Sequence, residues 1–124
     1  MNVYLACPRT IARVELRPIE DRLRLVLAKV NYVYRPCEID AAVRRPSMAF
    51  RLNLERLITS TTVVAVAGWT EDLAARREIQ VALWSGSTIY EQAGTGMHQV
   101  ILRKMSEQRV AAILDKGLQE QLAK

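Results

Sequence analysis

Cysteine and histidine are scarce in this chain, which has two cysteines and one histidine among 124 residues. Cys7 and Cys37 lie near the ends of two different predicted strands, without the spacing of metal ligands. We therefore expect two thiols rather than a disulfide or a metal centre. His98 has no serine or cysteine at a recognisable spacing, so the sequence gives no support for a catalytic triad. Neither a metal nor a cofactor is predicted.

Long apolar runs and glycine-rich loops are also missing. No apolar run approaches the ~18–20 residues of a membrane span. The first ten residues, MNVYLACPRT, lack the basic segment and long apolar run of a secretory signal. No glycine motif of the P-loop or dinucleotide type is present. These absences predict a cytoplasmic protein with no membrane partner.

The formal net charge is +5, and arginine supplies most of the positive charge. Arginine suits the binding of phosphate or carboxylate, although a mildly basic surface without a ligand explains the same composition. The basic residues are spread along the chain and are not interleaved with aromatic residues. This pattern does not favour a nucleic acid as the partner.

Short apolar segments alternate with amphipathic helical patterns along the chain. The predicted strands are Asn2–Ala6, Tyr32–Tyr34, Thr61–Ala67 and Ser87–Tyr90. The predicted helices are Arg17–Val30, Ser47 to about Ser60, Asp72 or Thr70 to Ser85, and most of Val100–Ala123. Such alternation is typical of α/β proteins with helices on both faces of a sheet. We predict one domain, residues 1–124, with a Rossmann-like parallel sheet of four to five short strands and a long C-terminal helix.

Several local signals set the expected helix ends. Pro18 fits the first turn of the first helix, and Asn31 is predicted to end that helix because asparagine tolerates positive φ. The segment Glu38–Arg45 is predicted to be a loop with a helical turn. The inner face of the helix that begins at Ser47 is predicted to carry Phe50, Leu54, Leu57 and Ile58. Apolar residues on several sides of the last helix predict a contact with the core or with another subunit.

The most informative segment is Thr62–Gly86, an apolar strand followed by Gly68-Trp69, a polar turn and a helix that carries Glu78. Ligands of α/β proteins bind at the carboxyl ends of the strands. A carboxylate there can attack an electrophile or accept hydrogen bonds from a sugar. A glutamate early in a helix is also stabilised by the helix dipole without any function, and both interpretations stay open.

Three motifs in order, VYLACP, NYVYRP and GW followed by AARREIQVALWSG, resemble the nucleoside 2-deoxyribosyltransferase-like superfamily. The match is to its DUF4406-type branch of phage and bacterial proteins, and it covers roughly residues 1–92. Residues 93–124 would form a C-terminal loop and helix in reach of a subunit interface. The resemblance implies a Rossmann-like fold, a homodimer or larger homo-oligomer, and a nucleoside or nucleotide ligand. It also implies transfer or hydrolysis at an N-glycosidic bond, with Glu78 as the catalytic residue.

The same resemblance implies which residues bind the ligand. They are Cys7, Pro8, Arg9 and Thr10 after the first strand, and Thr61, Gly68, Trp69 and Asp72 around the central strand. Arg9 would meet a phosphate, or would be an ordinary surface arginine. Trp69 would stack on a base, or would pack in the core. Tyr4 is assigned to the core, and Arg76 or Arg77 is expected to pair with Glu71 or Asp72.

The chain departs from the family pattern at four positions. Thr61 stands where the family has a sugar-binding aspartate, Asp72 replaces a serine, and Cys7 and Ala74 replace glycines. These differences remove a charge-assisted hydrogen bond and add bulk or negative charge where a ligand approaches. A second hypothesis is therefore a protein that keeps the fold without the catalysis. It would bind a nucleotide signal or a partner protein, such as a protein of a phage host.

Overall fold

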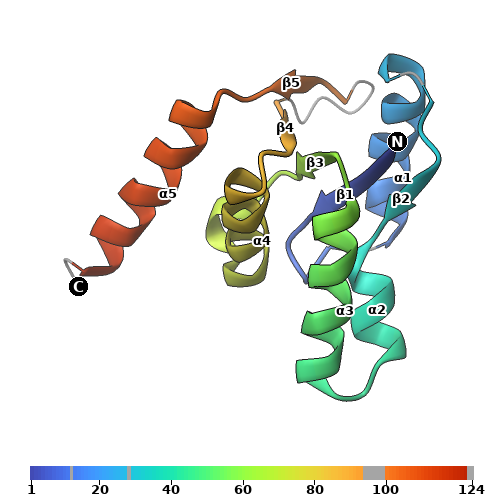
Figure 1. Ribbon diagram of the computed structural model, residues 1–124, viewed down its shortest axis with the longest axis horizontal. Helices are drawn as coiled ribbons and strands as arrows, with labels where there is room; N and C mark the ends of the chain where they lie inside the picture. Colours follow the sequence, from blue (N-terminus) through green and yellow to red (C-terminus); the bar gives the residue numbers. More distant parts are fainter. Residues whose placement is uncertain (12, 28, 94–99, 123–124) are drawn as a thin grey trace.

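The computed structural model describes residues 1–11, 13–27, 29–93 and 100–122 (Figure 1). The strands are β1 (Asn2–Ala6), β2 (Tyr32–Tyr34), β3 (Thr62–Ala65), β4 (Thr88–Gln92) and β5 (Leu102–Lys104). The helices are α1 (Arg13–Val26), α2 (Pro36–Ala42), α3 (Pro46–Thr59), α4 (Leu73–Trp84) and α5 (Glu107–Leu122), with a 3-10 turn η1 (Trp69–Glu71). The predicted α/β class is confirmed.

A single sheet has the strand order β2-β1-β3-β4-β5. The first four strands are parallel, and β5 runs antiparallel to β4. Every residue of β3 is buried, as its continuous apolar run predicts for a strand covered on both faces. The chain passes from β1 to β2 on one side and returns to β3 on the other. The loops that leave β1 and β3 therefore diverge, and such a switch point is where open α/β sheets bind ligands.

Helices cover both faces of the sheet. On one face α1 packs Leu16, Ile19 and Leu23 against the side chains of β1 and β3. The other face carries α3, α4 and α5, whose buried side chains pack against alternate residues of the same strands. Alternation along β1 sends Tyr4 to the α4 face and Leu5 to the α1 face.

The predicted limits of the first helix were wrong. The helix α1 runs from Arg13 to Val26, so Pro18 lies inside it rather than in its first turn. Pro18 is exposed, so the backbone hydrogen bond that proline cannot donate is missing on the solvent side of the helix. The longer helix also buries Leu16 in the core. The residue with positive φ after the helix is Lys29, at 60°, and not Asn31.

Two further predictions about helices are corrected. The region predicted as a loop with a helical turn forms α2, and α3 begins with Pro46 after Arg45 rather than with a Ser47 cap. The buried residues of α3 include Leu57, as predicted, but Phe50 and Ile58 are 55% and 57% exposed. The inward face of the helix instead carries the small Ala49 and the polar Asn53, and the buried amide of Asn53 donates a hydrogen bond to Asp40.

The C-terminal region is a strand and then a helix. Leu102–Lys104 forms β5, which the predicted helical stretch from Val100 overlooked. Glu91 of β4 binds Arg103 of β5 and Arg109 of α5, at 2.5 and 2.9 Å. This shared carboxylate fixes the edge strand and the start of α5 against β4. The predicted loop Gln92–Gly96 and His98 fall largely outside the described residues.

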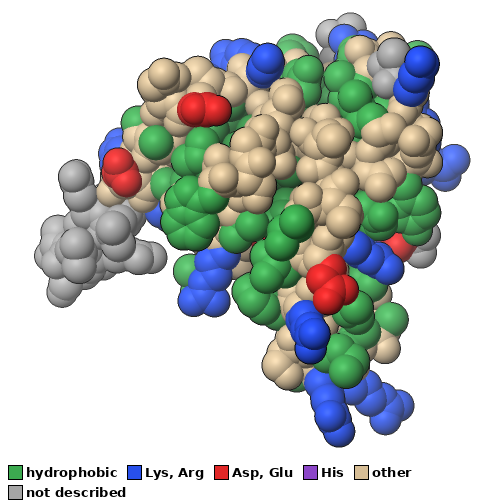
Figure 2. Space-filling view, in the orientation of Figure 1, with side chains coloured by type: hydrophobic (Ala, Val, Ile, Leu, Met, Phe, Trp, Pro, Cys, Tyr) green, Lys and Arg blue, Asp and Glu red, His purple; other side chains and the backbone are tan. Residues whose placement is uncertain are grey.

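Two apolar residues of α5, Val110 and Leu114, are buried in the core of the same chain beside α4. Exposed apolar side chains lie elsewhere, and include Phe50, Ile58 and Trp84 of α3 and α4. Figure 2 shows hydrophobic side chains at the surface over these two helices. Self-association stays a prediction. None of the described helices is long and apolar enough to cross a lipid bilayer.

The loops at the switch point touch through Gly68, whose φ is 90°. A Cβ atom at this position would lie 3.0 Å from Cγ of Pro8. We expect Gly68→Ala to lower the free energy of unfolding by roughly 2–3 kcal/mol in urea denaturation, because steric contact adds to backbone strain. Gly86→Ala is the matched control, since Gly86 also has positive φ but no atom within 4 Å. An equal loss in both variants would contradict a steric role for the Pro8 contact.

Candidate active site

The site lies at the carboxyl ends of β1 and β3. Asp72 joins the two loops there, and it also caps α4. Its Oδ1 accepts a hydrogen bond from the backbone N–H of Ala75 at 2.9 Å, and its Oδ2 accepts one from the backbone N–H of Arg9 at 3.1 Å. An N-cap aspartate satisfies helix donors that otherwise lack partners. Asp72 therefore holds the β1 loop against the start of α4 and places Arg9 beside that helix.

Glu78 lies in the second turn of α4 and points at the sheet. Its side chain is buried, with the residue only 6% exposed. The hydroxyl of Tyr4 donates a hydrogen bond to Glu78 Oε2. Arg9 Nη2 donates to the same oxygen at 2.8 Å. The other oxygen, Oε1, is buried and has no hydrogen-bond partner in the described part of the chain.

Arg9 is the centre of a network that spans four elements of the fold. Its Nε pairs with Asp40 Oδ2 of α2 at 2.9 Å, and its Nη1 donates to the carbonyl oxygen of Cys7 at 3.0 Å. Asp40 Oδ1 in turn accepts a hydrogen bond from the buried Asn53 Nδ2 of α3, at 3.0 Å. All three guanidinium nitrogens of Arg9 are thus bonded, which fixes the group beside Glu78.

Burial dominates the electrostatics of Glu78. It raises the pKa of the Glu78 carboxyl above its ordinary value, and Asp40 adds to the rise, while Arg9 and Tyr4 act in the opposite direction by stabilising the carboxylate. Burial and the neighbouring carboxylate both raise the pKa of Tyr4, so its hydroxyl remains a donor. Burial alone would lower the pKa of Arg9, but Glu78 outweighs it and the pKa is raised. A raised carboxyl pKa beside a fixed cation is common at catalytic sites.

A small pocket of about 40 Å³ adjoins Glu78 between α3 and α4. It is lined by Arg9, Phe50, Leu54, Ala74, Arg77, Glu78 and Val81. This volume holds a few water molecules, whereas small-molecule pockets usually measure about 300–1,000 Å³. A ligand as large as a nucleoside therefore requires side chains such as Arg9 or the half-exposed Phe50 to move.

Of the residues that the resemblance implies, the structure brings together Pro8, Arg9, Gly68, Asp72 and Glu78. Each lies in a loop at the carboxyl edge or in the first turns of α4.

Other predicted ligand residues lie elsewhere. Thr61 precedes β3 at the amino end of the sheet, the opposite end from Glu78, so the prediction that it meets the ligand was wrong. Trp69 is 5% exposed and packs in the core, and the side chain of Cys7 is buried on the α1 face. Thr10 is exposed in the loop after β1. Arg76 pairs with no acid among the described residues, and it donates to the carbonyl oxygens of Thr70 and Leu114.

Sequence reasoning missed Tyr4, Asp40 and Asn53 as parts of the site. Tyr4 is buried as predicted, but it also anchors Glu78 from a position 74 residues away in the chain. Period-two alternation would have placed Tyr4 and Ala6 on one face of β1, without showing which helix covers that face. No local signal pairs Asp40 with Arg9.

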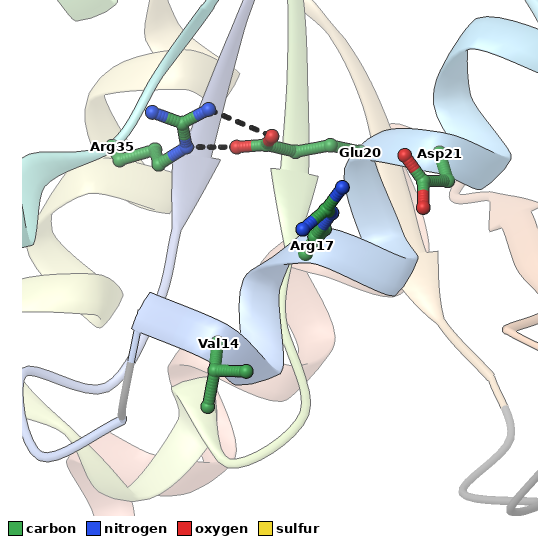
Figure 3. A pocket seen from close by; sticks show the side chains of 5 residues that line it. All are labelled: Val14, Arg17, Glu20, Asp21 and Arg35. Atoms are coloured by element: carbon green, nitrogen blue, oxygen red, sulfur yellow. Dashed lines mark hydrogen bonds and ion pairs between the residues drawn. The ribbon is translucent and has the colours of Figure 1, made fainter.

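A larger groove of about 530 Å³ lies beside α1 and the end of β2 (Figure 3). Its lining residues are Val14, Arg17, Glu20, Asp21 and Arg35. Arg35 Nη2 binds Glu20 Oε2 and Arg35 Nη1 binds Glu38 Oε1, both at 2.7 Å. These ion pairs tie α1 to the start of α2. The groove lies on the α1 face, whereas Glu78 lies on the α4 face.

No cluster of three or more potential metal ligands is present within the ranges that the structure describes. Comparisons of the chain with protein-family models, with curated proteins and with solved structures found no match. A function is therefore proposed from the geometry of this site.

Proposed function

We propose that the protein binds a nucleoside or nucleotide at the carboxyl ends of β1 and β3 and acts on its N-glycosidic bond through Glu78. The main observation behind this proposal is that the two oxygens of the Glu78 carboxylate have different surroundings. One oxygen is held by Tyr4 and Arg9, and the buried second oxygen has no partner among the described residues, in a side chain that lines a pocket. A fixed carboxylate with one available oxygen suits attack on an anomeric carbon, where positive charge develops.

The proposed reaction begins when Glu78 Oε1 approaches the anomeric carbon. A bond forms between that oxygen and that carbon as the carbon–nitrogen bond to the base breaks, and the bonding electrons leave with the base, which takes a proton from water. A water molecule or a second base then displaces Glu78. The first acceptor would make the protein a hydrolase and the second a transferase. In both cases Tyr4 keeps the carboxylate in position.

A second candidate function is binding without catalysis. The observations in its favour are the ion pair between Arg9 and Glu78 and the pocket of only about 40 Å³. In that case the loop network binds a nucleotide signal or a partner protein, and Glu78 serves as the buried counter-ion of Arg9.

Two measurements on the same samples separate the candidates. Free base is assayed after incubation with a panel of nucleosides and their 5′-monophosphates, and the melting temperature is recorded with each compound, because a ligand of the folded state raises it. Base release together with a higher melting temperature supports the enzyme. A higher melting temperature without base release supports the binding protein. No response in either measurement contradicts both nucleotide functions.

A further inference from the structure

We propose that Arg77 and Arg9 together receive an anionic group, so that the ligand of this site is a phosphorylated nucleotide rather than a neutral nucleoside. This inference rests on the proposed function, and it assigns Arg77 as the residue that determines this specificity.

Arg77 lies at the mouth of the pocket beside Glu78. It lines the same pocket as Arg9 and Glu78, and it is exposed. Arg9 uses its three guanidinium nitrogens within the protein, as described above. No hydrogen bond or ion pair of Arg77 is found among the described residues, so its donors are available to a ligand.

The position of Arg77 in α4 is not explained by helix stability. The helix dipole acts mainly on the first and last turns, and Arg77, the fifth residue of α4, lies in the second turn, so the dipole does not favour a cation at this position. Arg76 is accounted for by its hydrogen bonds to the carbonyl oxygens of Thr70 and Leu114. Arg77 has no such role within the described structure, and an anion at the pocket mouth would provide one.

The charges around the pocket also favour an anion. Arg9 is shared by Glu78 and Asp40, whereas Arg77 has no acidic neighbour within ion-pair distance among the described residues. The planar donor fork of a guanidinium matches the oxygens of a phosphate. The facing wall is apolar, formed by Phe50 and Leu54, and suits the carbon face of a sugar or base.

An anion between the two arginines would also open the site. Arg9 Nη2 now donates to Glu78 Oε2. A phosphate at Arg9 competes for that donor and draws the guanidinium away from Glu78. Tyr4 keeps the carboxylate in place, while the space that Arg9 leaves becomes available to the sugar. A phosphorylated ligand would thus create the room that the small pocket lacks.

Calorimetric titration at constant ionic strength tests this inference. The probes are inorganic phosphate, the four common 2′-deoxynucleosides and their 5′-monophosphates. Arg77→Gln is compared with the wild type and with Arg22→Gln, a matched control whose exposed arginine lies on α1, on the other face of the sheet. We expect Arg77→Gln to weaken binding of the monophosphates by about 10- to 100-fold, because a charge-assisted contact is lost. Binding of the nucleosides should change little, and Arg22→Gln should behave as the wild type.

Three results would overturn the inference. Equal losses in Arg77→Gln and Arg22→Gln would indicate only a general effect of charge. Equal affinity of the wild type for nucleosides and monophosphates, unchanged in Arg77→Gln, would refute phosphate recognition and leave the proposed function intact. Binding of inorganic phosphate that depends on Arg77, without binding of any nucleoside or nucleotide, would refute the proposed function and the nucleotide ligand while retaining the anion site.

Discussion

Replacing Glu78 with glutamine is expected to lower the rate of base release by about a thousandfold or more, with little effect on ligand binding. A loss of rate of this size is typical when a nucleophile, or a charge that stabilises the transition state, is removed from an enzyme site. The amide oxygen of glutamine can still accept the hydrogen bonds that Tyr4 and Arg9 donate to Glu78. The variant therefore keeps the shape of the site and loses the negative charge. The measurement is single-turnover release of base, with affinity determined in parallel.

Glu55→Gln provides the matched control, because Glu55 is an exposed glutamate of α3 with the same change of charge. Its base release should equal that of the wild type. Full base release by Glu78→Gln on a compound that the wild type cleaves would exclude Glu78 as the catalytic residue. Loss of affinity equal to the loss of rate would assign Glu78 to binding instead.

Removal of Arg9 is expected to destabilise the fold by about 3–5 kcal/mol at neutral pH, because it leaves a buried carboxylate with Tyr4 as its one remaining donor among the residues described. In Arg9→Gln the pKa of Glu78 should lie further above its ordinary value than in the wild type, because burial still raises it and Arg9 no longer stabilises the carboxylate. Glu78 then binds a proton more readily in the folded variant than in the unfolded chain. The stability of the variant therefore falls as pH rises from the unfolded pKa of Glu78 through its folded pKa. The loss of stability of Arg9→Gln is complete above the pKa that Glu78 has in the folded variant. It becomes smaller as pH falls toward the ordinary carboxyl pKa of 4.5.

Urea denaturation over a series of pH values measures this effect. The wild type, Arg9→Gln, Glu78→Gln and the double variant form a double-mutant cycle that isolates the interaction between the two side chains. The double variant should recover much of the stability that Arg9→Gln loses at neutral pH, although the pairing of Arg9 with Asp40 is still lost. A deficit that is independent of pH and unchanged in the Glu78→Gln background would contradict the role of Arg9 as counter-ion.

The parts of the fold that sequence predicts well are those set by local chemistry. β1 and β2 have the predicted limits because β1 is a short apolar run ended by a turn and β2 is ended by Arg35-Pro36. Asp72, one of the two predicted starts of that helix, caps α4 with its side-chain carboxylate, and Gly86, just past the predicted end at Ser85, has positive φ. The limits of α1 were missed because packing of Leu16 outweighed the local preference of Pro18 for a first turn.

The loops around the candidate site follow from the strand order, but the contacts within the site depend on tertiary packing. Tyr4 and Glu78 lie on β1 and α4, and only the handed connection between β3 and β4 brings them together. Thr61 was assigned to the site by its place in a motif, yet it lies at the wrong end of β3. A residue's place in a sequence motif shows which neighbours it has along the chain. The direction of the strand determines which of those neighbours lie at the carboxyl end, beside the candidate site.

The most direct test of the account is a crystal structure of the Glu78→Gln variant with a 2′-deoxynucleoside 5′-monophosphate. In this complex we expect the anomeric carbon to lie against the side chain at position 78, with the phosphate between Arg9 and Arg77. Arg9 should be turned away from position 78 relative to its place in the ligand-free fold. A nucleotide bound instead in the groove lined by Arg17 and Arg35, with the pocket beside α4 unchanged, would contradict it.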